Sequence, residues 1–206
     1  MKSHTSPTRA ELLRAKRLLS RVEQGARLLR RKRESLVRTL VPLARPAAEA
    51  RRAIDDTAAA AYRAEHAALA IHGEAAVAAT AWPPRTLEVE LDVERVWGVT
   101  LPSLADPPAF ERDLEARSTA PSSVGTALFE ATNHFELLAS HLVHAIARES
   151  QVRALATALA RTARQLHTLE QRVAPELAAR AASVASALDE RDREDQLRLR
   201  LLRRAR

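Results

Sequence analysis

One short stretch of the chain carries side chains that could hold a metal ion or move a proton. Glu130 and His134 stand four residues apart, and His141 and His144 stand three apart, so each pair would share one face of a helix. A metal site needs a third or fourth ligand and an ordered outer layer of partners, which this spacing does not provide. Exposed or partner-facing histidines explain the pattern better.

The other signatures of catalysis are missing from the sequence. The four glycines lie far apart, and no GxxxxGK sequence is present to cradle a phosphate. The chain has no cysteine, which excludes disulfides and thiolate metal sites, and its spacing suggests no set of serine, histidine and aspartate. We therefore expect no catalytic residue, no metal and no cofactor in this chain.

Long helices must position whatever this chain does present. Residues 152–193 contain no glycine and one proline, and their apolar residues recur every three or four positions. The positions are Val152, Leu155, Leu159, Leu166, Leu169 and Val173, followed after a four-residue step by Leu177, Ala181, Val184 and Leu188. The polar Thr162 occupies the seam position between Leu159 and Leu166. Such a seam is typical of a helix that packs along a partner helix. The step resembles a stutter, and Pro175 should bend the helix there.

The N-terminal stretch carries a matching seam. From Leu12 to Leu40, eight of nine seam positions are apolar, and Arg33 is the exception. Two seams at opposite ends predict an antiparallel coiled coil, although parallel pairing between two copies would use the same seams. The residues that we expect to pack together are Leu19, Val22, Leu29 and Leu36 with Leu166, Leu169, Val173, Leu177 and Val184.

Local signals place the ends of the helices. Ser6-Pro7, or Thr8 with Glu11, should begin the first helix. Pro42 and Pro46 should bend or break that helix, and a second one should follow to about Thr80. Ser122 or Ser123 should cap a return helix that runs to about Asp195, and residues 196–206 should fray.

The middle of the chain predicts a small sheet. Apolar and polar residues alternate over Thr86–Val93, and Val96–Leu101 provides a second strand, so together they predict a β-hairpin. Phe110–Ala116 predicts a short helix in the loop that follows.

These elements predict a mostly α fold. Its main feature is a long antiparallel two-helix coiled coil formed by the N- and C-terminal helices, with shorter helices and a small β-hairpin in the middle. Three segments follow: an N-terminal helical arm at 1–81, a hairpin and loop region at 82–121, and a C-terminal long helix at 122–206.

Charge is distributed unevenly along the chain. Residues 1–54 carry +11, residues 55–150 carry −9 and residues 151–206 carry +5. An antiparallel coil would bring both basic ends together, where they could steer toward an acidic partner. The candidate contact residues are Arg9, Arg14, Lys16, Arg17, Arg198 and Arg200. A basic coiled coil could instead bind nucleic acid or act as an adaptor, but aromatic residues make up only 3% and no reader motif is present.

Targeting signals are also absent from the sequence. No run of 18 apolar residues could span a membrane, so we expect no direct membrane insertion. The N-terminus lacks the apolar region of a signal peptide, and we expect a cytoplasmic location.

Two terminal motifs give the chain a family resemblance. The first is Ser6-Pro7-Thr8-Arg9, with Leu12, Leu13, Lys16, Leu19, Gly25, Leu28, Leu29, Lys32, Arg33 and Leu36. The second runs from Leu169 to Pro175 and continues with Leu188, Glu190, Arg191, Arg193 and Glu194. With these motifs the chain resembles the D subunit of the V-type and archaeal-type rotary ATPases, and Gly98-Val99 followed by Pro102 resembles the end of that family's hairpin.

The resemblance implies a role without catalysis. It implies a central rotor shaft whose paired ends enter a hexamer of A and B subunits, while the other end meets the F subunit and the C (or d) subunit. Ion flow would turn the shaft, and the shaft would carry torque to or from the catalytic sites. The location implied is the inner face of a membrane, as a peripheral part of the complex, with no nucleic acid bound.

Overall fold

The structure of the protein is a computed structural model, which describes residues 8–81, 84, 86–113 and 125–204. The chain forms two compact units. The first consists of residues 1–35 and 159–206, and the second of residues 36–158. The expected three-segment division at 1–81, 82–121 and 122–206 stays a prediction.

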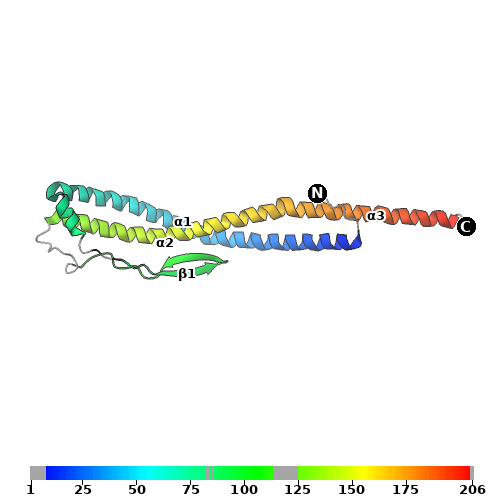
Figure 1. Cartoon of the computed structure of the whole chain (residues 1–206), viewed down its shortest axis with the longest axis horizontal. Coiled ribbons are helices and arrows are strands. Elements are labelled where there is room, and N and C mark those ends of the chain that lie inside the picture. Colours follow the sequence, from blue (N-terminus) through cyan, green and yellow to red (C-terminus); the bar gives the residue numbers. More distant parts are fainter. Residues whose placement is uncertain (1–7, 82–83, 85, 114–124, 205–206) are drawn as a thin grey trace. The chain divides into compact units, whose positions relative to one another are not determined.

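Helices make up most of the described residues. Helix α1 runs over Arg9–Thr80, α2 over Gly125–Thr168 and α3 over Ala174–Arg204, as Figure 1 shows. A π-helical turn, η2, covers Leu169–Val173 between α2 and α3. Strands β1 (Leu91–Val96) and β2 (Val99–Leu104) form an antiparallel hairpin. The predicted fold class, mostly α with paired terminal helices and a small hairpin, is confirmed.

In the first unit the two ends of the chain pair in opposite directions. Arg9 contacts Asp192 at 3.4 Å, and Arg30 contacts Glu170 at 2.6 Å. As the residue number rises along α1, the residue number of its partner falls. The pairing is antiparallel within one chain.

The second unit repeats this antiparallel arrangement with other contacts. Arg51 pairs with Glu149 at 3.4 Å. Farther along α1, the Tyr62 ring meets the Phe135 ring edge-on, with centroids 5.7 Å apart. The end of this unit holds a small core in which Ala68, Leu128 and Ala131 are buried.

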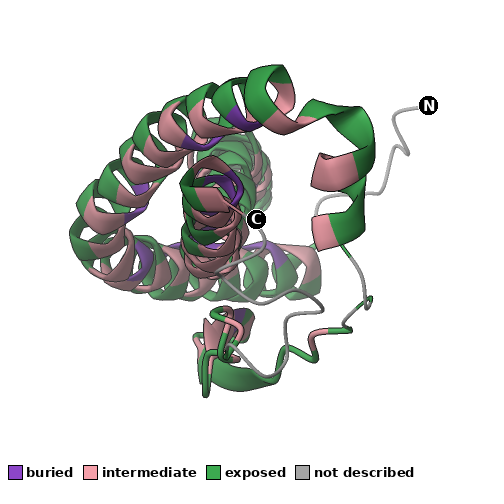
Figure 2. Cartoon of the chain, turned by 90° about the vertical axis from the view of Figure 1, so that its left-hand side faces the viewer, coloured by how far each residue is buried: buried purple, intermediate pink, exposed green. Residues whose placement is uncertain are grey.

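Small side chains fill most of the core. The buried apolar residues among those described are eight alanines and six leucines: Ala15, Ala26, Leu36, Ala47, Ala61, Ala68, Leu101, Leu128, Ala131, Leu138, Ala145, Leu155, Leu166 and Ala181. Figure 2 shows buried positions as short purple segments that recur along helices whose other residues are half-buried (pink) or exposed (green). Alanine allows close approach of two helices but removes little apolar area from water. Long, shallow contacts therefore hold the helices together.

The expected break at Pro42 and Pro46 is wrong, because α1 continues through both. Each proline removes one backbone donor, but packing on either side offsets the loss, since Leu36 and Ala47 are buried. The guanidinium of Arg148 also donates to the Pro46 carbonyl at 3.5 Å. The bend that these prolines were expected to cause stays a prediction.

The interruption in α1 lies instead at Gly73. Its φ of 80° and ψ of 168° are non-helical and are open almost only to glycine. Beyond this point Ala76 and Val77 pack against the core that contains Ala68 and Leu128. Gly73 therefore allows the last two turns of α1 to cover that core.

The hairpin forms, but its strands begin later than the sequence predicted. The expected strands were Thr86–Val93 and Val96–Leu101, whereas the observed ones are Leu91–Val96 and Val99–Leu104. Val96 pairs with Val99, so Trp97 and Gly98 form a two-residue turn with φ values of 51° and 76°. A type I′ turn needs positive φ at both positions, and Gly98 meets that need without strain. The turn chemistry, not the alternation, fixes the register.

Three other expectations concern the ends of elements. Thr8 caps α1, because its hydroxyl accepts the Glu11 N–H at 3.2 Å, while Ser6-Pro7 and Ser122-Ser123 lie outside the described residues. The expected helix at 110–116 is wrong for 110–113, which are not helical, and 114–116 lie outside the described residues. The expected fraying is also wrong for 196–204, since α3 continues to Arg204, and 205–206 lie outside the described residues. Leucine and arginine are strong helix formers, and Arg198 pairs with Glu194 one turn earlier.

Candidate functional site

The six candidate contact residues lie in the first unit, near the start of α1 and the end of α3. They are Arg9, Arg14, Lys16, Arg17, Arg198 and Arg200, and all are exposed. Arg9 pairs with Asp192 at 3.4 Å, and Arg198 lies 3.8 Å from Glu194 and 3.7 Å from Asp195. Pairs this exposed contribute roughly 0–1 kcal/mol, so a partner could replace them at little cost.

Sequence reasoning missed an apolar feature beside these charges. Every residue of α3 from Asp189 onward is exposed, including four leucines. Leu197, Leu199, Leu201 and Leu202 are 57%, 59%, 65% and 67% exposed. We call residues 193–204 the leucine–arginine end. The signal was present as four leucines within six residues, but the arginines between them favoured a solvated tail.

Helix α3 extends past the ion pair that joins it to the start of α1. Asp192, the partner of Arg9, lies twelve residues before the end of α3 at Arg204. A helix that presents leucine and arginine without burying either is typical of a surface that packs on another protein.

The predicted seam residues lie on the covered sides of the helices. Leu36 and Leu166 are buried, at 0% and 2% exposure. Leu19, Val22, Leu29, Leu169, Val173, Leu177 and Val184 are half-buried. At the polar position of the N-terminal seam, Arg33 is exposed and its neighbour Lys32 is half-buried. The covered stripe therefore shifts by one residue there, as expected for a helix with 3.6 residues per turn.

The π-turn explains the four-residue step in the C-terminal seam. Eight residues separate Leu169 from Leu177, and in an α-helix they would point about 80° apart. A π-turn takes up one extra residue, which returns Leu177 to the seam. The Ala174 N–H donates to the Leu169 carbonyl, five residues back, directly before Pro175. Because Pro175 cannot donate, this is where an α-helical ladder is weakest.

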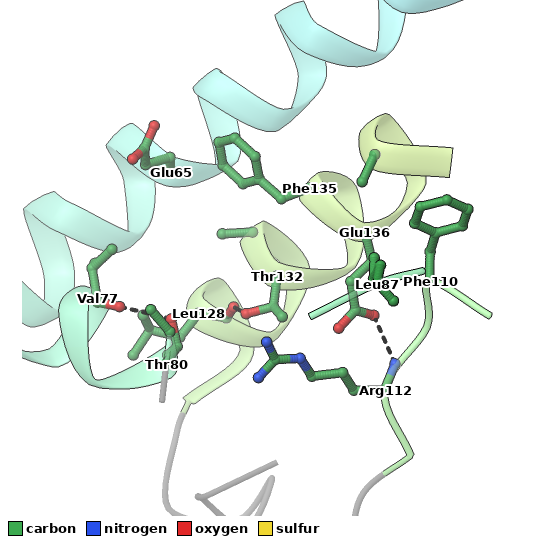
Figure 3. A pocket seen from close by; sticks show the side chains of 13 residues that line it. Glu65, Val77, Thr80, Leu87, Phe110, Arg112, Leu128, Thr132, Phe135 and Glu136 are labelled. Carbon is green, nitrogen blue, oxygen red and sulfur yellow. Dashed lines mark hydrogen bonds between the residues drawn. The ribbon is translucent and has the colours of Figure 1, made fainter. Parts of the chain in front are cut away.

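One opening in the second unit is mostly apolar. Its volume is about 430 Å³, and it lies between the end of α1, the start of α2 and the segment around Phe110 (Figure 3). The hydroxyls of Thr80 and Thr132 donate to carbonyls of their own helices, at 2.7 and 2.9 Å. The Arg112 N–H donates to a carboxylate oxygen of Glu136 at 3.3 Å. The two threonine hydroxyls and the Arg112 N–H therefore make local hydrogen bonds that serve the fold.

The histidines form no metal centre within the described residues. Nδ1 of His141 lies 3.4 Å from the Thr57 hydroxyl, a contact between helices. Across residues 8–81, 84, 86–113 and 125–204, no group of three histidine, cysteine, aspartate or glutamate side chains could hold a metal ion.

Comparisons with known proteins agree with a partner-binding role. Residues 11–204 match the family model for the ATP synthase D subunit. The chain is 37% identical over 202 residues to the V-type ATP synthase D subunit of Anaeromyxobacter dehalogenans strain 2CP-1, covering 98% of this chain and 96% of that one. It is 34% identical over 209 residues to the protein of the same name from Thermus thermophilus, covering 98% and 88%.

Proposed function

The chain belongs to the family of the ATP synthase D subunit, and from that premise we propose that it is the shaft that carries torque in a V-type rotary ATPase. It is a central-stalk subunit of that complex. A shaft needs length, stiffness and an asymmetric surface, and it needs no pocket. The long helical pairs of both units fit that need, and no helix in the described residues is long and apolar enough to cross a membrane.

The leucine–arginine end is the observation that carries the proposal. It is a helix without a partner in the described chain, and it presents exposed leucines together with arginines. We propose that it enters the cavity of a hexamer of A and B subunits, together with the nearby Arg14, Lys16 and Arg17. Leucines would pack on an apolar ring, while the basic residues would face acidic groups around it.

Many weak contacts suit a rotating part. Each exposed charge pair would contribute roughly 0–1 kcal/mol. A single strong bond to one catalytic interface would hold the shaft at one angle. The chain itself would bind no nucleotide and catalyse nothing, and its asymmetric surface would set the state of each A/B interface in turn.

The remaining partners follow from the same premise. The F subunit and the C (or d) subunit would bind the shaft outside the hexamer, and the whole would sit peripherally at the inner face of the membrane. The alternative, a basic coiled coil that binds nucleic acid or acts as an adaptor, finds no support among the relatives.

Grouped charge reversal tests the proposal in reconstituted complexes. Arg14, Lys16, Arg17 and Arg200 would be changed together to glutamate, and ATP hydrolysis and ion pumping would be measured at low and high salt. We expect weaker assembly and coupling, more so at low salt, where screening is least.

Four other exposed arginines provide the control. Arg21, Arg38, Arg52 and Arg63 are exposed and lie away from the leucine–arginine end in sequence. Reversing them changes the net charge by the same amount. Equal loss in both variants, or unchanged coupling at low salt in the first, would mean that the basic end is only a solvated surface.

A further inference from the structure

The two strands of the hairpin differ in how far they are covered. Residues Leu91 to Arg95 of β1 are all exposed. In β2, Leu101 is buried at 4% exposure, and its neighbours are mostly half-buried. Within the described residues, β1 is therefore the outward strand of the pair that Figure 1 draws as green arrows.

The register fixes which backbone groups of β1 point outward. Val96 and Val99 flank a two-residue turn, a pair that exchanges both of its hydrogen bonds. Such pairs alternate along the ladder, so Glu94 bonds to Leu101 and Asp92 to Ser103. The Ala105 N–H donates to the Glu90 carbonyl at 3.4 Å, which continues the same alternation.

It follows that the N–H and C=O groups of Leu91, Val93 and Arg95 point away from β2. The two outer edges are then chemically different. Pro102 stands opposite Val93, so the outer edge of β2 lacks a donor at its centre. The outer edge of β1 contains no proline and keeps its donors. A proline on one edge blocks strand addition there and leaves the other edge open.

The two faces of β1 also differ. Leu91 and Val93 lie on one face and are 55% and 58% exposed. Asp92 and Glu94 lie on the other face and are exposed. At the tip, Trp97 is 50% exposed and adopts a φ of 51°, which is rare for a bulky residue. Backbone strain of this kind is concentrated at functional positions.

We propose that the outer edge of β1 binds an extended strand of a partner subunit in which apolar and basic residues alternate. Backbone hydrogen bonds to Leu91, Val93 and Arg95 would add that strand to the sheet. Its apolar residues would lie beside Leu91 and Val93, and its basic residues beside Asp92 and Glu94. A second copy of β1 fits poorly, because antiparallel pairing would place carboxylates beside carboxylates.

Synthetic peptides added to the full-length protein test whether the outer edge of β1 binds a strand and whether that strand must carry basic residues. The probes are two capped eight-residue peptides, one alternating valine with lysine and one alternating valine with glutamate. We expect the lysine peptide alone to slow hydrogen exchange of the Leu91, Val93 and Arg95 amides, by about tenfold or more at saturation. The same three amides should be slow in the native complex.

Proline placement provides a matched pair of variants. Val93→Pro removes an outward donor and should abolish binding, while the slow exchange of the Leu101 amide should persist and report an intact hairpin. Val93→Thr keeps the donor and should still bind. Four results would overturn the proposal: equal binding of both peptides, protection of Thr100 and Leu104 instead, dimerisation of the chain through β1, or fast exchange of the three amides in the native complex.

Discussion

The guanidinium of Arg30 meets the carboxylate of Glu170 at 2.6 Å, and Glu170 lies inside the π-turn. The contact joins α1 to the π-helical turn between α2 and α3. The two side chains are 54% and 28% exposed, so water screens the pair only in part.

In a double-mutant cycle with Arg30→Met and Glu170→Gln, we expect a coupling of about 0.5–1 kcal/mol in urea unfolding. The Arg45–Glu49 pair, at 87% and 58% exposure, is the control and should couple more weakly. If the Arg30–Glu170 coupling energy at low salt is no larger than the Arg45–Glu49 coupling energy, the expectation is wrong.

Because the π-turn takes up one extra residue, we expect the protein to tolerate deletion of Pro175. Removing Pro175 would leave Leu169, Val173 and Leu177 at steps of four and three, which restores an unbroken heptad seam. It would also remove the residue that cannot donate. We expect the deletion variant to keep or raise its melting temperature.

A deletion elsewhere in the same helix is the comparison. Ala160 is exposed, and its removal would rotate Thr162, Leu166 and Leu169 by about 100° away from the seam. That variant should melt several degrees lower. If deleting Pro175 is as harmful as deleting Ala160, the π-turn does not act as the insertion that keeps the seam in phase.

Gly25 and Gly73 should respond oppositely to alanine. A Cβ on Gly25 would lie 4.0 Å from the Leu169 side chain, an ordinary contact, so close packing does not require glycine there. Gly25→Ala should stabilise the protein by about 1 kcal/mol through helix propensity. Gly73→Ala should destabilise it by roughly 1–3 kcal/mol, because its φ of 80° and ψ of 168° strain any other residue. Denaturant unfolding of both variants checks the signs.

Truncating a covered seam leucine should cost far more than truncating an exposed one. Leu166 is 2% exposed, and Leu166→Ala should destabilise by about 2–5 kcal/mol. Leu28 is 60% exposed on α1, and Leu28→Ala should change the unfolding free energy by about 0.5 kcal/mol or less. Similar losses at both sites would mean that the seam is not where the helices pack.

The leucine–arginine end should matter for assembly and not for stability. Replacing Leu197, Leu199, Leu201 and Leu202 by glutamine keeps helix propensity and should leave thermal unfolding of the isolated chain unchanged. Assembly with the catalytic subunits should weaken, as measured by co-purification. Glutamine at the exposed apolar residues Ile71, Leu137, Leu142 and Ile146 of the second unit is the control. Normal assembly of the first variant would remove the leucines from the contact.

The sequence predicted the repeating apolar seams, and it missed two local features of α1, at Gly73 and at Pro42. The spacing of apolar residues predicts that Leu166 and Leu177 lie on one seam. A helix that packs along its whole length repeats apolar residues at a regular spacing, and this repeat is visible in the sequence. The helical geometry of α1 is interrupted at Gly73, although no proline lies beside it. Pro42 was expected to bend or break the helix, yet α1 continues through it. Tertiary packing decides between such local signals, and it cannot be read from neighbouring residues alone.

The candidate contact residues follow from charge and stay a prediction, while the exposed leucines beside them have no comparably clear signal in the sequence. Arg198 and Arg200 were identified because arginine clusters stand out in a count of charges. Leu199 and Leu201 alternate with these arginines, a pattern that also fits a solvated tail, so the sequence alone does not single the leucines out. The register of the hairpin was misjudged for a related reason, because positive φ at Trp97 has no signal in the residue type.

Antiparallel pairing also sets the order in which this chain can fold. His141 and Thr57 are 84 residues apart in sequence, Arg51 and Glu149 are 98 apart, and Arg9 and Asp192 are 183 apart. The start of α1 therefore leaves the ribosome long before its partner in α3 does. Closing a long loop costs less after the shorter loops inside it have closed. We expect pulse-labelled hydrogen exchange during refolding to protect the region around Thr57 before that around Arg9, and the reverse order would contradict this expectation. Until the last residues of α3 emerge, the start of α1 remains an unpaired apolar seam, which makes it a natural substrate for a chaperone.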